Sequence, residues 1–282
     1  MNMFKTMFGL TLLTLLLVFA GGFAGGPRGA VIALIVAGIG NFIAYFFSDR
    51  IVLAMYGAQE LSPDQAPAIH RMVEDLAEKA GIPKPKIYGI PSSTPNAFAT
   101  GRNPSHAAVA VTQGITSMLS ERELRGVLAH ELGHVINRDI LLSTLVATLA
   151  GAIGHLAFVA RWFGPSRDDE DSGGGILGLL IVGIVLPIVA VMVQMFISRQ
   201  REFMADETGG RLCEDPVSLA TALQHLEIGA KQVPMDATPA TAHMFIVNPL
   251  TGGGLMSLFS THPSTEERVQ RLMTLAQDLG RA

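Results

Sequence analysis

The chain has 282 residues, of which 49% are hydrophobic and only 16% are charged, and its mean hydropathy is +0.40. That composition is too apolar for an ordinary soluble protein, in which about 25% of the residues are charged. The net charge of -4, without a long basic run, excludes the basic face that nucleic-acid binding needs, and the single cysteine excludes an internal disulfide.

Four apolar segments without a charged residue are each long enough to cross a bilayer, for which about 20 residues suffice. They are residues 6–27, 29–48, 140–160 and 172–198. The first segment also resembles a secretory signal peptide, but the second follows after only Arg28, which favours a transmembrane hairpin. His155 and several small residues interrupt the third segment, so a helical hairpin that enters only part of the bilayer stays an alternative there.

The positive-inside rule predicts the orientation of these segments. The basic residues expected on one side are Lys5, Arg50, Arg138, Arg199 and Arg201. The loop between the third and fourth segments contains the acidic run 168–171 and is expected outside. We therefore expect a multi-pass protein of the inner (cytoplasmic) membrane whose polar parts face the cytoplasm.

The expected organisation has four parts. An N-terminal transmembrane hairpin occupies residues 1–50, and the first part of a cytosolic domain occupies 51–139. A second transmembrane hairpin occupies 140–198, and the second part of the domain occupies 199–282. The expected fold class is α+β and mostly helical: a four-helix membrane anchor with a cytosolic domain that contains a small β-sheet.

The first polar part is predicted to contain two helices around that sheet. One helix covers residues 62–80, with Ser62 as N-cap and Pro63 in the first turn. Segments 85–90 and 107–112 are rich in β-formers, with 96–101 between them. The second helix starts at a capping box, Ser120 with Glu123, and continues to the membrane at Ile140.

The second polar part is predicted to contain three helices and one irregular stretch. Helices are expected at 199–212 and 216–229, followed by a long mobile loop over 230–261 that contains several Pro and Gly residues. Ser264 and Glu267 form a second capping box, which starts a closing helix.

The motif His130-Glu131-Leu132-Gly133-His134 indicates a metal site. Residues four apart lie on one face of a helix, so the two imidazoles are placed to bind one ion. Glu131 then lies beside the ion as the general base for a water molecule. The alternative is a surface helix that carries two histidines by chance.

A catalytic zinc takes three protein ligands and leaves one position open. The two segments 140–160 and 172–198 are expected to be antiparallel, which brings their polar flanks together. Glu202 follows the fourth segment as closely as His134 precedes the third, so it is the candidate third ligand. Asp206, one turn further along, is placed to accept a hydrogen bond from a ligating imidazole. A solvated helix face is the alternative for both carboxylates.

Three motifs together resemble the HtpX membrane zinc metalloproteases, bacterial relatives of the CAAX prenyl-protein endopeptidase. They are the HELGH motif followed by Asn137 and Asp139, the segment Arg201-Glu202-Phe203-Met204-Ala205-Asp206, and the segment Asn96-Ala97-Phe98-Ala99-Thr100-Gly101. The resemblance covers essentially the whole chain. It implies a zincin-like protease domain with one Zn²⁺ per chain, bound by His130, His134 and Glu202 and supported by Asp206.

Two further roles follow from this resemblance. Asn96, Ala97, Phe98 and Ala99 look like the edge strand that holds an extended peptide substrate, and an ordinary strand is the alternative. The segment around His262, with Arg268 six residues later, looks like the family's late motif, in which both residues would stabilise the oxyanion. A helix-start turn at His262 and a surface charge at Arg268 are the alternatives.

The resemblance implies a zinc-dependent endopeptidase that cuts misfolded or damaged membrane proteins on the cytoplasmic side, as quality control under stress. The expected partners are membrane-protein or peptide substrates and the lipid bilayer, with no nucleic acid. The sequence leaves open a homo-oligomer, the natural substrates, the cleavage preference and a divalent ion other than zinc.

Two other classes of membrane protein fit this sequence less well. An intramembrane zinc protease carries its HExxH motif inside an apolar span, whereas here charged residues at 121–123 and 138–139 flank the motif. A membrane protein with a structural zinc would normally use four ligands and favour cysteines, whereas Cys213 lies outside the motif.

Overall fold

The computed structural model describes residues 2–141, 144–145, 199–232, 246 and 263–281. The expected span 172–198, nearly all of 140–160, most of the expected loop 230–261, and His262 lie outside the described residues. The four-part division of the chain therefore stays a prediction.

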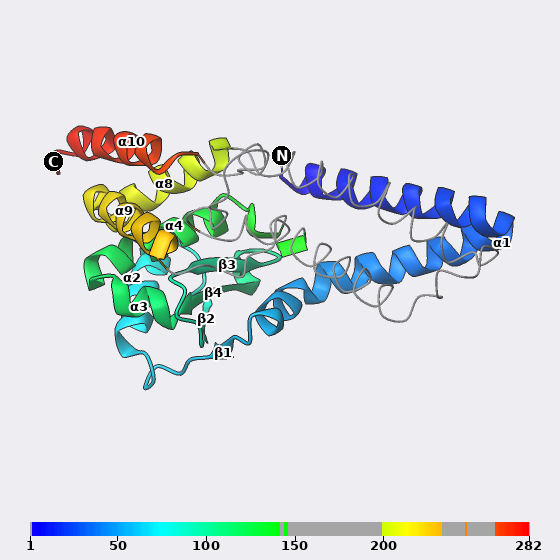
Figure 1. Cartoon of the computed structure of the whole chain (residues 1–282), viewed down its shortest axis with the longest axis horizontal. Coiled ribbons are helices and arrows are strands. Elements are labelled where there is room, and N and C mark those ends of the chain that lie inside the picture. The colour runs from blue at the N-terminus through cyan, green and yellow to red at the C-terminus, as the bar shows by residue number, and fades with distance from the viewer. Residues whose placement is uncertain (1, 142–143, 146–198, 233–245, 247–262, 282) are drawn as a thin grey trace.

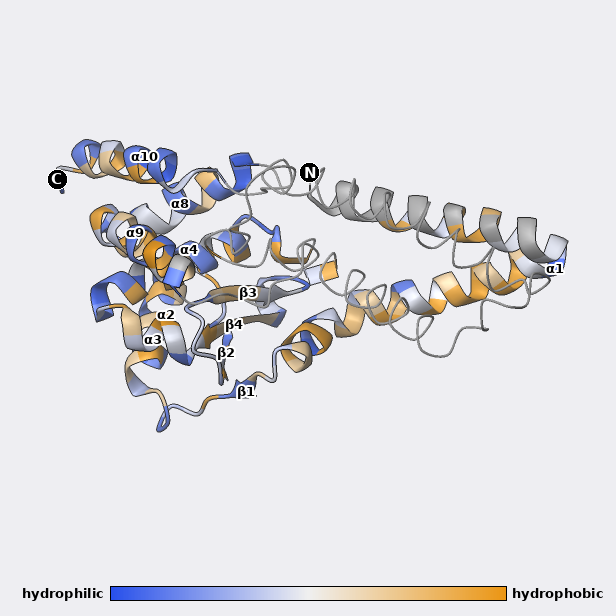
Figure 2. Cartoon of the chain, viewed as in Figure 1, coloured by the Kyte–Doolittle hydropathy of each residue, from blue (hydrophilic) through white to orange (hydrophobic). Residues whose placement is uncertain are grey.

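The N-terminal apolar region forms a helical hairpin. Helix α1 (Asn2–Met55) is broken at Gly25 and Gly26, where Gly26 has a φ of 61° that only glycine adopts easily, and its two arms run antiparallel (Figure 1). The amide of Asn41 donates to Thr14 Oγ1 across the arms at 2.8 Å. Among the described residues, the stretch Gly25–Met55 is long and apolar enough to cross a membrane, and most of this arm has the colour of hydrophobic residues in Figure 2.

A four-stranded mixed sheet lies beside the end of this hairpin. Its strands are β1 (Gln59–Glu60), β2 (Lys86–Ile90), β3 (Ala97–Gly101) and β4 (Ala107–Thr112), in the order β1-β2-β4-β3. β2 runs parallel to β4, whereas β3 is antiparallel to β4 and forms an edge of the sheet. The expected small sheet is thus present, and the short strand β1 is an addition that no sequence signal indicated.

The α-helices that follow α1 in the described residues lie together on one side of this sheet (Figure 1). They are α2 (Pro67–Ala80), α3 (Gln113–Met118), α4 (Glu121–Ile136), α8 (Arg199–Cys213), α9 (Pro216–Gln232) and α10 (Thr265–Asp278). Of these helices, α3 and α4 contact the strands of the sheet. Both hydrogen bonds of the capping box at the start of α4 are present: the Ser120 hydroxyl accepts from the Glu123 N–H, and the Glu123 carboxylate accepts from the Ser120 N–H. At α10 the Ser264 hydroxyl accepts from the Glu267 N–H, as expected for an N-cap.

Three features of the helices differ from the predictions: the start of α2, the presence of α3 and the end of α4. Helix α2 begins at Pro67 and not at Ser62, because residues 62–66 form a turn in which the Gln65 and Ala66 N–H groups donate to the Ser62 carbonyl. Helix α3 was not predicted. Helix α4 ends at Ile136, short of Ile140, because Arg138 adopts a left-handed φ of 57°.

Helix α4 occupies the centre of the domain, with the sheet on one side and α8 and α9 on the other (Figure 1). Small residues let α4 and α8 approach closely. A Cβ atom at Gly209 of α8 would lie 2.7 Å from the backbone nitrogen of His130, and one at Gly133 of α4 would lie 3.0 Å from the Ala205 carbonyl. This close packing holds residues of α8 directly against the HELGH motif.

Candidate metal centre

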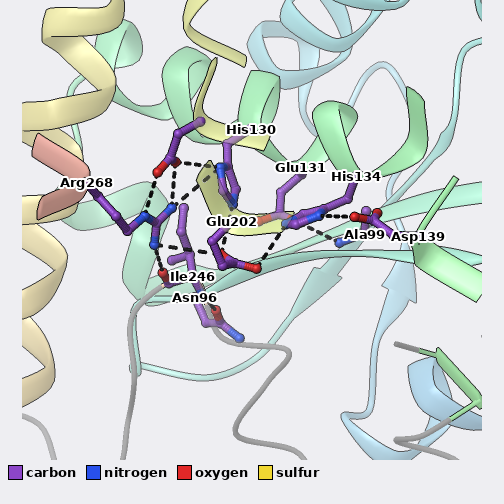
Figure 3. Close-up of polar contacts among 10 residues, drawn as sticks. Asn96, Ala99, His130, Glu131, His134, Asp139, Glu202, Ile246 and Arg268 are labelled. Carbon is purple, nitrogen blue, oxygen red and sulfur yellow. Dashed lines mark hydrogen bonds and ion pairs between the residues drawn. The ribbon is translucent and has the colours of Figure 1, made fainter. Parts of the chain in front are cut away.

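Three side chains from two helices converge at the contact between α4 and α8 (Figure 3). The rings of His130 and His134 lie edge to face, with centroids 4.8 Å apart. Glu202 lies opposite them: its Oε2 is 3.7 Å from Nε2 of His130, and its Oε1 is 3.7 Å from Nε2 of His134. One ligand atom from each residue lies within 4.8 Å of the others.

This donor set fits a zinc ion. Zinc bonds of 2.0–2.1 Å in a tetrahedron imply ligand atoms about 3.4 Å apart, close to the separations found here. Two imidazoles and one carboxylate are also the ligand number of a catalytic zinc, which keeps its fourth position open. The structure therefore places His130, His134 and Glu202 where one ion can bind all three.

Behind His130 lies a buried carboxylate and guanidinium pair. Asp206 Oδ1 is 2.9 Å from Nδ1 of His130, so the Nε2 atom of this ring is left for the metal. Arg268 binds Asp206 with two hydrogen bonds, from Nε at 2.8 Å and from Nη2 at 2.7 Å. Although burial alone would raise the pKa of Asp206, Arg268 holds that pKa well below its ordinary value. Asp206 therefore stays ionised and fixes the orientation of His130.

Arg268, which is expected to contact the oxyanion, is a buried residue of α10. Its side chain is only 2% exposed, and its Nη1 donates to the Ile246 carbonyl at 2.6 Å. Its Nε and Nη2 bind Asp206, and its Nη1 also lies 3.9 Å from Oε2 of Glu202, so Arg268 contacts the ligand set from behind, and the oxyanion role stays a prediction. The expected partner in that role, His262, lies outside the described residues.

A second carboxylate, Asp139, supports His134 in the same way. Its Oδ2 lies 3.2 Å from Nδ1 of His134, and Asp139 is 2% exposed. The positive charge of Arg201 acts on both Asp139 and Glu202. Arg201 is half-buried, and its burial lowers the pKa of its guanidinium. No role was assigned to Asp139 from the sequence. The sequence signal for this role was a carboxylate five residues after His134. In the structure, Arg138 has a left-handed backbone conformation, which turns the chain back toward His134.

Glu131 points from α4 toward the edge strand β3. Its Oε2 accepts a hydrogen bond from the Ala99 N–H at 2.8 Å, and the residue is 4% exposed. Burial raises the pKa of the Glu131 carboxyl above its ordinary value. The residue expected to be the general base is thus hydrogen-bonded to the strand expected to hold the substrate.

The remaining residues of the expected substrate strand are buried by this chain. Ala97 and Ala99 lie in the core shared with α4, while the Phe98 ring packs against Tyr56 with centroids 5.3 Å apart. The Asn96 side chain accepts a hydrogen bond from the Ile246 N–H at 3.3 Å. Asn96 therefore anchors a distant part of the chain, which the sequence did not indicate.

Zinc binding is expected to weaken as the pH falls. Burial alone would lower the pKa of His134, but the Asp139 carboxylate raises it to about 10 in the metal-free protein. A proton must leave this ring before a metal binds, so each pH unit between about 6 and 9 should strengthen zinc binding about tenfold. Chelator competition at fixed pH measures this affinity. A flat profile over that range would show that His134 carries no proton in the metal-free state.

Comparison with known proteins identifies the family. Residues 63–276 match Peptidase family M48. A protein described as "Protease HtpX homolog" from Aquifex aeolicus (strain VF5) is 55% identical over 272 residues, which cover 94% of this chain and 90% of the relative. A protein with the same description from Syntrophobacter fumaroxidans (strain DSM 10017 / MPOB) is 53% identical over 278 residues, which cover 96% of this chain and 99% of the relative.

A solved structure has a similar fold. The crystal structure of S. mikatae Ste24p matches with a TM-score of 0.51 and 22% identity, covering 96% of this chain and 65% of that protein. The present chain thus spans about two thirds of the length of Ste24p. The family match and the HtpX homologues, together with the HELGH motif and the assembled ligand set, establish that the chain belongs to peptidase family M48 and is a membrane metalloprotease.

Proposed function

We propose that this metalloprotease is a zinc-dependent endopeptidase that cuts misfolded or damaged membrane proteins on the cytoplasmic side of the inner membrane. The observation that carries the proposal is the contact of Glu131 with β3. It supports a role for Glu131 as general base, because this carboxylate lies between the three residues that can hold a metal and an edge strand of the sheet.

The chain's own residues account for positioning and for proton transfer. A peptide that lies along the outer edge of β3, where the Ala99 N–H is bonded to Glu131, is held extended beside this carboxylate, as in other cases of strand addition. Glu131 takes a proton from the attacking water and passes it to the leaving amine, so no covalent intermediate is needed. Zinc bound at the site would supply a Lewis acid that lowers the pKa of water to about 7.

The surroundings of the site support membrane proteins as substrates. His134 lies only six residues before Ile140, where the expected third apolar segment begins, and Glu202 lies four residues after the fourth. Substrates in the same bilayer reach such a site at a raised effective concentration. The cytoplasmic orientation is supported by the basic residues Arg50, Arg138, Arg199 and Arg201 on the side of the site.

Removal of the metal tests the proposal directly. A strong chelator is expected to abolish cleavage of an unfolded membrane protein in detergent, because the remaining groups cannot polarise the peptide carbonyl. One equivalent of zinc should restore cleavage, and metal analysis should then find about one zinc per chain. Cleavage that persists in metal-free protein would refute a metal-dependent mechanism.

A further inference from the structure

The surface of the bilayer can be placed on the second arm of α1. Residues 29–48 are uncharged, and Asp49 and Arg50 are the first charges after them. Phe46 and Phe47 are exposed by 41% and 40%, and the Arg50 guanidinium lies 5.8 Å above the Phe47 ring. Arginine near a helix end extends toward the polar interface while its stem stays on apolar surface. The boundary between hydrocarbon and water therefore lies between Phe46 and Arg50.

The edge strand β3 ends at this same level. Arg102, which follows the last residue of β3, donates from Nη1 to the Phe46 carbonyl at 3.4 Å, and its guanidinium lies 5.5 Å above the Phe46 ring. The contact joins residues 56 positions apart in the sequence. Arg102 is thus placed at the height of the lipid headgroups, where it complements their phosphate charge.

A second contact fastens the end of β3 to the start of the expected third apolar segment. The hydroxyls of Thr100 and Thr144 are 3.0 Å apart, and the Gly101 N–H donates to Thr144 Oγ1 at 3.3 Å. Thr144 is 0% exposed, and its hydroxyl also donates to the Ile140 carbonyl at 2.7 Å. The end of β3 is therefore held between α1 and the residues that follow Ile140.

The distance along β3 from Glu131 to the bilayer surface is short. The Ala99 N–H marks the position of Glu131 along β3, and Arg102 is three residues further. At a rise of about 3.4 Å per residue, the base lies about 10 Å from the bilayer surface along the strand. Three extended residues of a paired peptide cover the same distance.

From this geometry we infer that the preferred substrates are juxtamembrane segments of proteins that are themselves anchored in the bilayer. A segment that lies along the outer edge of β3 meets the bilayer surface at Gly101 and Arg102, just beyond Ala99. The outward Ala99 and Gly101 N–H groups are already bonded to Glu131 and Thr144. The first bond that can reach Glu131 then lies about three residues from the point where the segment leaves the membrane. The inference rests on the proposed function and adds a substrate class to it.

Spacer length gives a quantitative expectation. Bonds closer to the bilayer than about three residues cannot reach Glu131 without drawing hydrocarbon-buried residues into water. Longer flexible spacers do reach it, but effective concentration falls with length once the spacer exceeds the span. The rate is therefore expected to rise sharply near three residues, to peak near three to six, and to fall by several-fold toward a free peptide.

The experiment uses the full-length protease with zinc in liposomes that contain anionic lipid. The substrates carry one transmembrane helix and one cleavable cassette, separated by Gly/Ser spacers of about 0, 3, 6, 12 and 24 residues. The same cassette as a free peptide and the Glu131→Gln protease are the controls. Mass spectrometry identifies the bond that is cut.

The outcomes separate the inference from the proposed function. A minimum spacer near three residues supports the inference. Equal rates at every spacer, a minimum above about ten residues, or cuts inside the hydrocarbon would overturn it while leaving a protease in place. No zinc-dependent cleavage of any substrate, the free peptide included, would instead overturn the proposed function and the inference with it.

A charge-reversal pair tests the role of Arg102. Arg102→Glu should lower the rate on the shortest cleavable anchored substrate at least threefold, because it removes the contact with Phe46 and repels anionic headgroups. Its rate on the free peptide should stay within twofold. Arg71→Glu on the exposed face of α2 is the matched control and should change neither rate. Equal losses on anchored and free substrates for Arg102→Glu would show that Arg102 serves only to fold the domain.

Discussion

Replacing Glu131 by Gln is expected to lower kcat by about 10²- to 10⁴-fold while zinc stays bound in a one-to-one ratio. Glutamine has nearly the shape of glutamate and retains a carbonyl oxygen that can accept the Ala99 N–H. It cannot take up the proton of the attacking water, so only the chemical step is affected. Single-turnover cleavage measures kcat, and metal analysis of the same sample measures zinc.

A matched variant separates this effect from a general change on the helix. Glu121 lies on the exposed first turn of α4, so Glu121→Gln should retain full activity. Loss of zinc from the Glu131→Gln protein would make Glu131 a metal ligand and not the base. Undiminished kcat would assign proton transfer to another group.

Replacing Arg268 by Met is expected to destabilise the protein by about 3–5 kcal/mol, the usual cost of leaving a buried ionic partner unpaired. Arg268 is 2% exposed and Asp206 is also 2% exposed, so little solvent replaces the lost hydrogen bonds. The unpaired Asp206 carboxylate would then take up a proton or shift, and His130 would lose its orientation. Unfolding in denaturant measures stability, and chelator competition measures zinc affinity.

The neighbouring Arg271 provides the control for this substitution. It lies on the same helix, is 54% exposed, pairs with Glu267 and lies 3.6 Å above the Phe203 ring. Arg271→Met should cost about 1 kcal/mol or less. Adding Asp206→Asn to Arg268→Met should recover part of the lost stability but not zinc affinity. Equal effects at positions 268 and 271 would refute a special role for Arg268.

Local sequence signals predicted the parts of the fold that depend on neighbouring residues. The capping box at Ser120, the β-forming segments of β2 and β4, and the helical spacing of α8 and α9 all act over a few residues, and each element is present. The HELGH spacing likewise placed two imidazoles on one face of α4. Such patterns are readable because the helix and strand periods fix which side chains meet.

Contacts between residues that are distant in the sequence could not be predicted from local patterns. Asp139 and Arg201 meet only because α4 ends early and α8 packs beside it, and the partner of Asn96 is a backbone group 150 residues away. Arg268 looked like a surface charge or a substrate contact, since no spacing rule predicts that a helix buries an arginine against Asp206, 62 positions earlier. The true start of α2 depended on the turn at 62–66, where a local hydrogen bond from the Ser62 N–H to the Gln65 side chain competes with the helix.

The residues that bind and orient the metal ligands are far apart in the sequence, which has a consequence for biosynthesis. His130, Glu202 and Arg268 are contributed by stretches that leave the ribosome at widely separated times, and the arginine comes last. Until residue 268 has been translated and docked, Asp206 has no counterion and the imidazole it orients is free to turn. We therefore expect a chain that stops before residue 268 to carry the whole HELGH motif and yet to lack the arginine that keeps Asp206 and His130 in place for metal binding.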